Sequence, residues 1–175
     1  MSNSIKGIAL LALIAIAGLT GCRQQVPAPP GTPDPPLARS GSADRDYVAA
    51  ALAYQEGERE QALAALKRVV DSDPNRIMAQ MLIGNIYRER EDYAAAVDHY
   101  RAVARLDPYV SENHYNVGLM EHYLRHLRQA AGAYLRAVEL DPNDYRPNMH
   151  LGLVYNALGR PDDGLRYAQQ AVKLA

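Results

Sequence analysis

The sequence of 175 residues contains no phenylalanine, no tryptophan and a single cysteine. Without a second cysteine the chain cannot form an intramolecular disulfide, so packing alone must hold its folded part together. All of its bulky aromatic surface has to come from 12 tyrosines. The 19 basic and 20 acidic side chains give a formal net charge of −1, which gives no reason to expect nucleic-acid binding.

Sequence motifs of enzymes are also missing. The chain has no Gly-x-Ser-x-Gly nucleophile elbow, no phosphate-binding glycine loop and no paired-cysteine motif. Acidic residues are plentiful, but helix caps and solvated helix faces account for their spacing. The sequence therefore predicts a protein that is not an enzyme and needs no cofactor.

One dipeptide returns at a fixed interval. Asp-Pro occurs three times, and each proline follows the previous one by 34 residues: Asp73-Pro74, Asp107-Pro108 and Asp141-Pro142. A residue before proline is biased away from the helical conformation, so each dipeptide predicts the end of a helix. A period of this length is typical of stacked repeats that each contain two helices, and such arrays bind partners along an extended surface.

Three other positions follow the same interval. A small residue recurs near the middle of each expected first helix, a second one recurs early in each second helix, and a larger residue follows four positions later. The three sets are Ala50, Gly84, Gly118 and Gly152; Ala62, Ala96, Ala130 and Gly164; and Leu66, Tyr100 and Tyr134, with Ala168 as a weaker match. Small residues at these places would let two helices approach closely, while the larger ones fill the space between pairs.

These residues resemble the tetratricopeptide (TPR) pattern of an apolar-glycine pair, a tyrosine three residues later, an alanine, an aromatic residue and a proline. Tyr87 and Tyr155 match the tyrosine position, whereas Ala53 and Glu121 depart from it, and the usual tryptophan position matches in no repeat. The resemblance implies an all-α superhelix of about four helix-turn-helix repeats, at residues 43–76, 77–110, 111–144 and 145–175. It also implies that a protein or peptide binds to the array.

Local signals agree with the helical interpretation. Asp92 and Asp144 stand where helix N-caps are expected. Gly159 suits a turn between two helices, and Pro161 suits a first helical turn, where its missing N–H has no intrahelical partner.

The first 21 residues are typical of a lipoprotein signal peptide. Lys6 precedes an apolar run over residues 7–18, which is too short to span a bilayer comfortably but suits a signal-peptide core. The run leads into Leu19-Thr20-Gly21-Cys22, which resembles the bacterial lipobox. The resemblance implies that residues 1–21 are removed and that Cys22 carries a diacylglycerol thioether, usually with an N-linked acyl chain such as palmitate. The alternatives are an ordinary cleaved signal with a free thiol and a membrane-spanning anchor.

Residues 22–42 connect the expected anchor to the expected repeats. Arg23 follows the cysteine at a position where aspartate tends to retain enterobacterial lipoproteins in the inner membrane, so we expect the outer membrane, with the protein facing the periplasm. The segment is rich in proline and cannot bury enough apolar surface to fold. It is therefore expected to be an extended tether, with a ligand for another domain as the less favoured alternative.

In TPR arrays the first helix of each pair lines a concave groove. The residues that match its positions combine aromatic and methionine side chains for apolar contact with polar side chains that can orient a peptide. They are Tyr47, Tyr54, Met78, Met81, Asn85, Arg88, Tyr115, Asn116, Leu119, Tyr123, Arg146, Met149, His150 and Asn156. For several of the tyrosines and methionines, packing between helices is the alternative role.

Two sharper alternatives concern the polar residues. Some TPR domains clamp a C-terminal carboxylate, and the matching residues here are Met81, Asn85, Asn116, Arg146 and His150, of which Met81 and His150 break the pattern. His122 and His126 share a helical face, with His114 about two turns earlier, but no catalytic zinc motif accompanies them. We therefore expect solvated or interfacial histidines and no metal site.

Together these features predict a membrane-anchored scaffold in envelope assembly, similar to TPR lipoproteins that assist secretins in pilus assembly. An adaptor for cell-wall enzymes is the alternative. Arrays usually finish with a polar capping helix, whereas the last helix here carries Leu165, Ala168, Ala171, Val172 and Leu174. We therefore expect self-association or partner docking at the C-terminal end.

Overall fold

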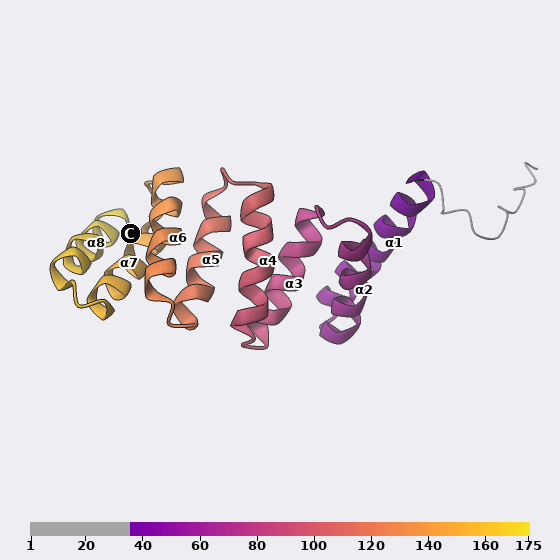
Figure 1. The fold of residues 1–175 in the computed structure, drawn as a ribbon, viewed down its shortest axis with the longest axis horizontal. Coiled ribbons are helices and arrows are strands. Elements are labelled where there is room, and N and C mark those ends of the chain that lie inside the picture. The colour runs from indigo at the N-terminus through magenta and orange to yellow at the C-terminus, as the bar shows by residue number, and fades with distance from the viewer. Residues whose placement is uncertain (1–35) are drawn as a thin grey trace, which may run out of the picture. The chain divides into compact units, whose positions relative to one another are not determined.

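The described part of the protein is a row of helices. The structure, a computed structural model, describes the backbone of residues 36–175 and the side chains of residues 41–175. Within this range there are eight α-helices and no β-strand (Figure 1). They are α1 (Pro36–Gln55), α2 (Arg59–Ser72), α3 (Ile77–Glu89), α4 (Tyr93–Leu106), α5 (Ser111–Tyr123), α6 (Leu127–Leu140), α7 (Tyr145–Ala157) and α8 (Pro161–Leu174). The expected signal peptide, Cys22 and the tether as far as residue 35 lie outside the described residues.

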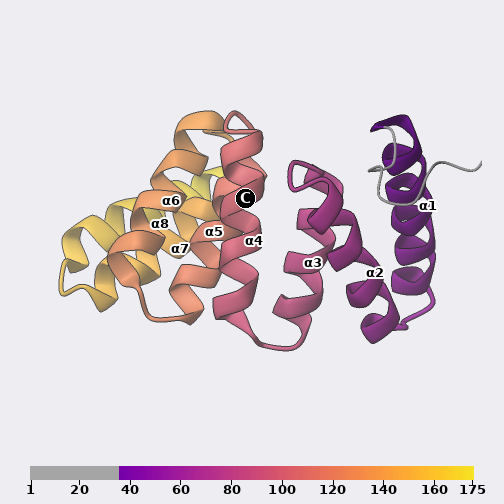
Figure 2. The same cartoon turned by 45° about the vertical axis from the view of Figure 1, so that its right-hand side comes forward.

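The helices form pairs that stack in chain order. The main contacts join each helix to the next one along the chain, from α1 with α2 to α7 with α8. Figures 1 and 2 show the same succession from two directions. The all-helical array expected from the 34-residue interval is confirmed, and α3, α5 and α7 begin at Ile77, Ser111 and Tyr145.

The first helix is longer than the others and begins at Pro36, within the segment expected to be a tether. Proline is favoured in a first helical turn because its missing N–H has no intrahelical acceptor to lose. Residues 36–42 were expected to belong to the unfolded tether, and this part of the prediction is wrong. Gly41 costs the helix only about 1 kcal/mol, which a packed helix can absorb.

The turn inside each pair has the same backbone conformation in all four repeats. Gly57, Glu91, Arg125 and Gly159 have positive φ angles of 85°, 62°, 62° and 74°. The next N–H in each turn donates to the carbonyl five residues earlier, as in the bond from Arg160 N–H to Tyr155 O at 2.9 Å. This Schellman arrangement satisfies the last carbonyls of the first helix, and it confirms the turn expected at Gly159.

The expected helix starts are also confirmed. The Asp92 carboxylate accepts a hydrogen bond from Ala95 N–H at 3.1 Å, and the Asp144 carboxylate accepts one from Arg146 N–H at 2.9 Å. Pro161 lies in the first turn of α8. Side-chain caps of this kind satisfy N–H groups that have no acceptor within the helix.

Within repeats two and three, a glycine on the first helix faces a tyrosine ring on the second. A Cβ atom on Gly84 would lie 3.0 Å from Tyr100 Cε1, and one on Gly118 would lie 2.7 Å from Tyr134 Cδ1. Both tyrosines are fully buried. The small residues therefore allow the close approach that the sequence predicts. The rings of Tyr100 and Tyr134 fill space within their own pair as well as at the junction with the next pair, where they were expected.

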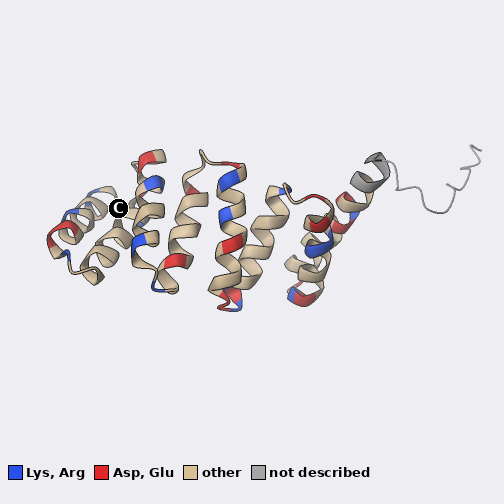
Figure 3. Cartoon of the chain, in the orientation of Figure 1, with Lys and Arg blue, Asp and Glu red and all other residues tan. Residues whose placement is uncertain are grey.

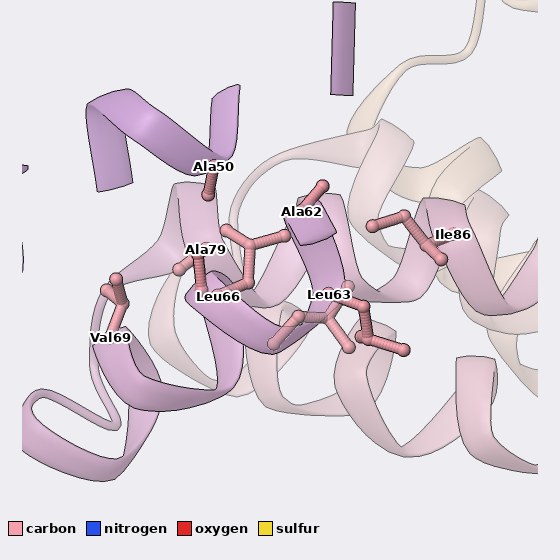
Figure 4. Packing of buried hydrophobic residues seen from close by; sticks show 9 residues of the cluster. Ala50, Ala62, Leu63, Leu66, Val69, Ala79 and Ile86 are labelled. Carbon is pink, nitrogen blue, oxygen red and sulfur yellow. The ribbon is translucent and has the colours of Figure 1, made fainter. Parts of the chain in front are cut away.

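Between repeats, the second helix of one pair packs against the first helix of the next. Figure 4 shows Leu63 and Leu66 of α2 among Ala50 of α1 and Ala79 and Ile86 of α3. Two further clusters repeat this arrangement along the array. The core is thus a series of junctions, and each junction needs apolar surface from two successive repeats.

Candidate functional site

The groove residues expected from the sequence come from α1, α3, α5 and α7, the first helices of the four pairs. Of these helices, α3, α5 and α7 carry few charges: α7 has only Arg146, and α3 has only Arg88 and Glu89, near its end. Figure 3 shows α3 and α5 as mostly uncharged ribbon, while α4 carries charges along its length. The surface formed by the first helices is therefore suited to apolar and neutral polar contacts.

The expected groove residues differ in their accessibility. Met78, Tyr123, Met149 and Asn156 are exposed, and most of the others are half-buried. Asn116 is only 6% exposed, so a partner cannot reach it without displacing the helices around it. Packing against neighbouring helices covers this position of α5, so Asn116 differs from the accessible groove residues.

A pocket of about 340 Å³ opens between α5 and α7. Its lining residues are Leu119, His122, Tyr123, Arg125, His150 and Leu153. Three of them, Leu119, Tyr123 and His150, belong to the expected groove. The pocket brings side chains from successive first helices to one place, as a binding groove requires.

Aromatic rings surround His150 beside this pocket. Its ring stacks on Tyr134, with centroids 5.2 Å apart and planes 12° apart, and its Nε2 lies 3.2 Å from the Tyr115 hydroxyl. The His122 ring approaches edge-on, with a centroid separation of 5.9 Å. Burial, followed by the proximity of His122, lowers the pKa of His150, and burial followed by Arg125 lowers the pKa of His122. Both rings are therefore neutral at pH 7, when they can accept or donate a hydrogen bond.

Two buried polar atoms in this cluster have no hydrogen-bond partner among the described residues: the Tyr134 hydroxyl and His150 Nδ1. In the preceding repeat the equivalent hydroxyl, on Tyr100, donates to Asn85 Oδ1 at 2.7 Å. Leu119 stands 34 residues after Asn85, so the acceptor is absent for Tyr134. Buried polar groups in folded proteins are normally paired, so these two atoms are an exception within the array. Because they are enclosed, a bound chain could reach them only if the side chains around them moved.

The N-terminal half of the groove is different, because its polar side chains are already paired. The Tyr54 hydroxyl donates to Glu89 Oε1 at 2.6 Å, and the Arg59 guanidinium lies 4.2 Å above the Tyr54 ring. Asn85 accepts from Tyr100. In the α5–α7 pocket, by contrast, Tyr123 and Arg125 are exposed.

A second groove, of about 540 Å³, lies at the C-terminal end between α7 and α8. Met149, Leu153 and Asn156 line it from α7, so it continues from the inner surface onto the end of the array. On α8, Leu165 is 58% exposed and Val172 is 79% exposed, whereas Ala171 is buried. The apolar end face expected from the sequence is thus open over most of its residues.

Comparison with known proteins identifies this architecture. Residues 47–111 and 122–175 match the family described as tetratricopeptide repeat. The chain belongs to the tetratricopeptide-repeat family. Its TPR array occupies most of the described residues, as the sequence resemblance implied.

Three proteins are similar to this TPR chain in sequence or in fold. The general transcriptional corepressor trfA of Dictyostelium discoideum is 29% identical over 111 residues, which is 61% of this chain but only 8% of that protein. The crystal structure of the MamA protein superposes with a TM-score of 0.74 at 21% identity, covering 77% of this chain and 74% of the other. The first TPR of Spaghetti (RPAP3), bound to the HSP90 peptide SRMEEVD, has a TM-score of 0.61 at 20% identity, covering 69% and 95%. These two structural likenesses show the fold alone.

In this chain, Arg146, the cation expected for a carboxylate clamp, is already bound to two carboxylates of the chain itself. The Arg146 guanidinium binds Asp144 Oδ2 and Glu112 Oε2, each at 2.7 Å, and lies 4.7 Å above the Tyr115 ring. The hydrogen bonds that Arg146 donates to Asp144 and then to Glu112 raise its pKa, so its charge is permanent. A partner's carboxylate would have to displace two internal ones, which makes Arg146 an organiser of the groove wall.

The histidines of the TPR array do not assemble as a metal site. His126 Nδ1 lies 3.0 Å from Glu121 Oε2, and His114 Nε2 lies 3.0 Å from the Pro108 carbonyl oxygen. His122 turns instead toward His150. Among residues 41–175, no three His, Cys, Asp or Glu side chains come together in a way that could hold a metal ion.

Sequence reasoning missed one buried charge. Glu121 is almost fully buried and contacts both Arg101 of α4 and His126, which precedes α6. The only signal was that Glu121 occupies a position where TPR repeats, including two here, carry tyrosine. A carboxylate in an apolar position predicts a nearby cation, and Arg101 supplies it.

None of the helices between residues 36 and 175 is long and apolar enough to cross a membrane.

Proposed function

We propose that this TPR chain is a lipid-anchored scaffold of the bacterial envelope that binds a protein or peptide in the groove between α5 and α7. The observation that carries the proposal is the α5–α7 pocket, where the exposed Tyr123 and Leu153 lie beside the polar side chains of His122 and Arg125. Apolar side chains supply contact area and polar side chains select an orientation, which is the usual composition of a binding site. The peptide bound to the Spaghetti (RPAP3) TPR offers a precedent for this class of ligand.

The proposed anchor is Cys22, at the end of the lipobox-like Leu19-Thr20-Gly21-Cys22. Arg23 in place of aspartate favours the outer membrane, with the TPR array on the periplasmic side. Several acyl chains together hold a protein far more firmly than one, since each buried methylene contributes roughly 0.8 kcal/mol. The proline-rich segment after Cys22 serves as the tether.

A labelling experiment tests the anchor. The full chain is expressed in a Gram-negative bacterium with labelled palmitate, beside Cys22→Ser and the nearby control Gln25→Ser. We expect label and membrane association in the wild type and the control, and loss of both in Cys22→Ser. Label retained by Cys22→Ser would show that the anchor is elsewhere.

A pull-down tests the groove and the pathway together. Tyr123 is exposed in the pocket, and Tyr109, 78% exposed in the loop before α5, is a matched control outside it. Full-length wild type, Tyr123→Arg and Tyr109→Arg are used as bait in detergent-solubilised envelopes, after circular dichroism shows equal helix content. We expect secretin or pilus components with wild type and Tyr109→Arg, and at least about tenfold less with Tyr123→Arg.

Other recoveries would change the proposal. Cell-wall hydrolases or synthases in place of pilus components would replace the pilus role with that of an adaptor for cell-wall enzymes. Equal recovery by all three baits would remove the α5–α7 pocket as the binding site. Self-association through the C-terminal repeat is a further part of the proposal, and it needs a surface of its own.

A further inference from the structure

The end face of α8 is an incomplete repeat junction. Leu165 is 58% exposed, yet the residues at the same repeat position, Leu63, Val97 and Ala131, are all buried. At those three positions the first helix of the next pair provides the cover, through the contacts of α2 with α3, α4 with α5 and α6 with α7. The α7–α8 surface is thus one half of a junction that occurs three times within the array.

The outer face of α1 is the other half. Leu52 is 53% exposed, whereas the residues at its repeat position, Ile86, Met120 and Val154, are fully buried. Val48 is likewise exposed and lines a shallow groove with Ala49 and Leu52. Ile86, Met120 and Val154 are the side chains through which α3, α5 and α7 pack against the preceding pair.

The α7–α8 half-face also has more room than the internal junctions. Leu66, Tyr100 and Tyr134 are fully buried, but the residue at their position in the last repeat is the exposed Ala168. The smaller side chain leaves part of the 540 Å³ groove between α7 and α8. An incoming helix can therefore seat bulky aliphatic side chains more deeply here than at the internal junctions.

We propose that the α7–α8 groove of one copy binds the outer face of α1 of a second copy, head to tail, so that the junction between copies reproduces the junction between repeats. Leu52 of the second copy then takes the place that Ile86 has against α2. This rests on the self-association in the proposed function and names the surface that meets the C-terminal repeat.

A polar contact favours the same partner. At the internal junction before α5, Asn113 Nδ2 donates to the Asp107 carbonyl oxygen at 2.9 Å. The residue at the position of Asn113 in the first repeat is Arg45, and the residue at the position of Asp107 in the last repeat is Ala175, the C-cap of α8. Arg45 of the second copy would thus face the carbonyl end of α8, where the helix dipole favours a cation. Its long stem can lie along the apolar face while the guanidinium stays at the rim.

Because the two surfaces differ, the contact is heterologous and does not close on itself in a dimer. Each added copy exposes a new α7–α8 groove, so the assembly grows as an open row. A symmetric dimer would instead use the same surface twice. This difference makes the proposal testable with two single substitutions.

Sedimentation of the full chain in detergent provides the test. We expect the wild type to form a concentration-dependent series of oligomers. Leu52→Arg and Leu165→Arg each place a charge in one half-face, so each alone should associate at least about thirtyfold more weakly, as for loss of a hot-spot contact. Mixed in equal amounts, the two variants should form dimers and nothing larger, because each retains the half-face that the other has lost.

Tyr109→Arg, in the loop between α4 and α5, is the control and should sediment as the wild type does; circular dichroism confirms that all variants are folded. Three outcomes overturn the proposal: a monomeric wild type, an equal mixture that stays monomeric, or Leu52→Arg chains that still associate with one another as wild type does. Groove binding is measured separately by the Tyr123→Arg pull-down, so failure of either proposal leaves the other to be judged on its own result.

Discussion

Repeats three and four have the same backbone arrangement, but side chains of different size lie between their two helices. In repeat three, Gly118 accepts the fully buried Tyr134 ring. In repeat four, a Cβ atom on Gly152 would meet the Gly164 carbonyl oxygen at 3.2 Å, and Ala168 occupies the position of the ring. Repeat three thus uses a large side chain for packing between its own helices. Repeat four has a small side chain there, so its helices lie close together and apolar surface stays exposed for contacts outside the pair.

The largest difference in stability between the two repeats should appear when the Tyr134 ring is removed. We expect Tyr134→Ala to lower the free energy of unfolding by about 3–5 kcal/mol, because it leaves a cavity between α5 and α6. Ala168→Ser, at the same position of repeat four, should change it by less than about 0.5 kcal/mol because that side chain is exposed. Urea unfolding followed by circular dichroism measures both. Equal losses for the two variants would contradict the difference in filling.

The second contrast concerns the tyrosine position of the repeat. Repeat three has Glu121 there, bound to Arg101, whereas repeat four has Tyr155, with the Arg160 guanidinium 4.8 Å above its ring. Arg101→Met should cost about 2 kcal/mol, less than the loss of a fully buried pair because Arg101 is 44% exposed. Arg160→Met should cost less than about 1 kcal/mol. Urea unfolding measures both variants. A larger loss of stability for Arg160→Met than for Arg101→Met would contradict the expectation that the Arg101–Glu121 pair is the stronger contact.

The third prediction tests the close approach in repeat three. Gly118→Ala places a methyl group against a ring that has no room to move, so we expect a loss of about 1–2 kcal/mol. Gly132→Ala is the matched control: Gly132 lies inside α6 with nothing within 4 Å of the added atom. Removing a helix-interior glycine there should raise stability by up to about 1 kcal/mol. Thermal unfolding of both variants should therefore move in opposite directions.

The smallest expected effect depends on pH. The pKa of His150 is lowered mainly by burial, with a further contribution from His122, so the unfolded chain binds a proton more readily than the folded one. Stability is therefore complete above the ordinary value of 6.5 and falls as the pH drops below it. Burial, and then the nearby Arg125, lower the pKa of His122 in the same way. His150→Gln should show a shallower decline in melting temperature between about pH 7 and 5.5, and an unchanged slope would contradict this cause.

Much of the array could be predicted from particular residues. The Asp-Pro dipeptides mark the ends of α2, α4 and α6, and Asp92, Asp144 and Pro161 mark helix starts, because these signals act within one turn of the chain. The close approach of two helices at small residues such as Gly84 also follows from their recurrence every 34 residues. Such features depend on local backbone preferences and on a period that repeats, and both can be read along the sequence.

The roles of the groove residues could not be predicted in the same way. Asn116 was expected to face a partner but is buried, and Arg146 is held by Asp144 and Glu112. His122 and His126 were expected to share a helical face, but α5 ends at Tyr123 and His126 precedes α6, so the His122 ring meets His150 of the next repeat instead. These contacts depend on how successive pairs rotate against each other, which no single repeat encodes.

The stack of helix pairs with small residues at the helix contacts follows from the sequence alone, because a strict period leaves few other ways to bury the apolar faces. The lack of partners for the Tyr134 hydroxyl and His150 Nδ1, and the open apolar faces of α1 and α8, are visible only in the folded array. Burial and hydrogen bonding at a junction are shared between two repeats. They are settled only when the neighbouring repeat is in place.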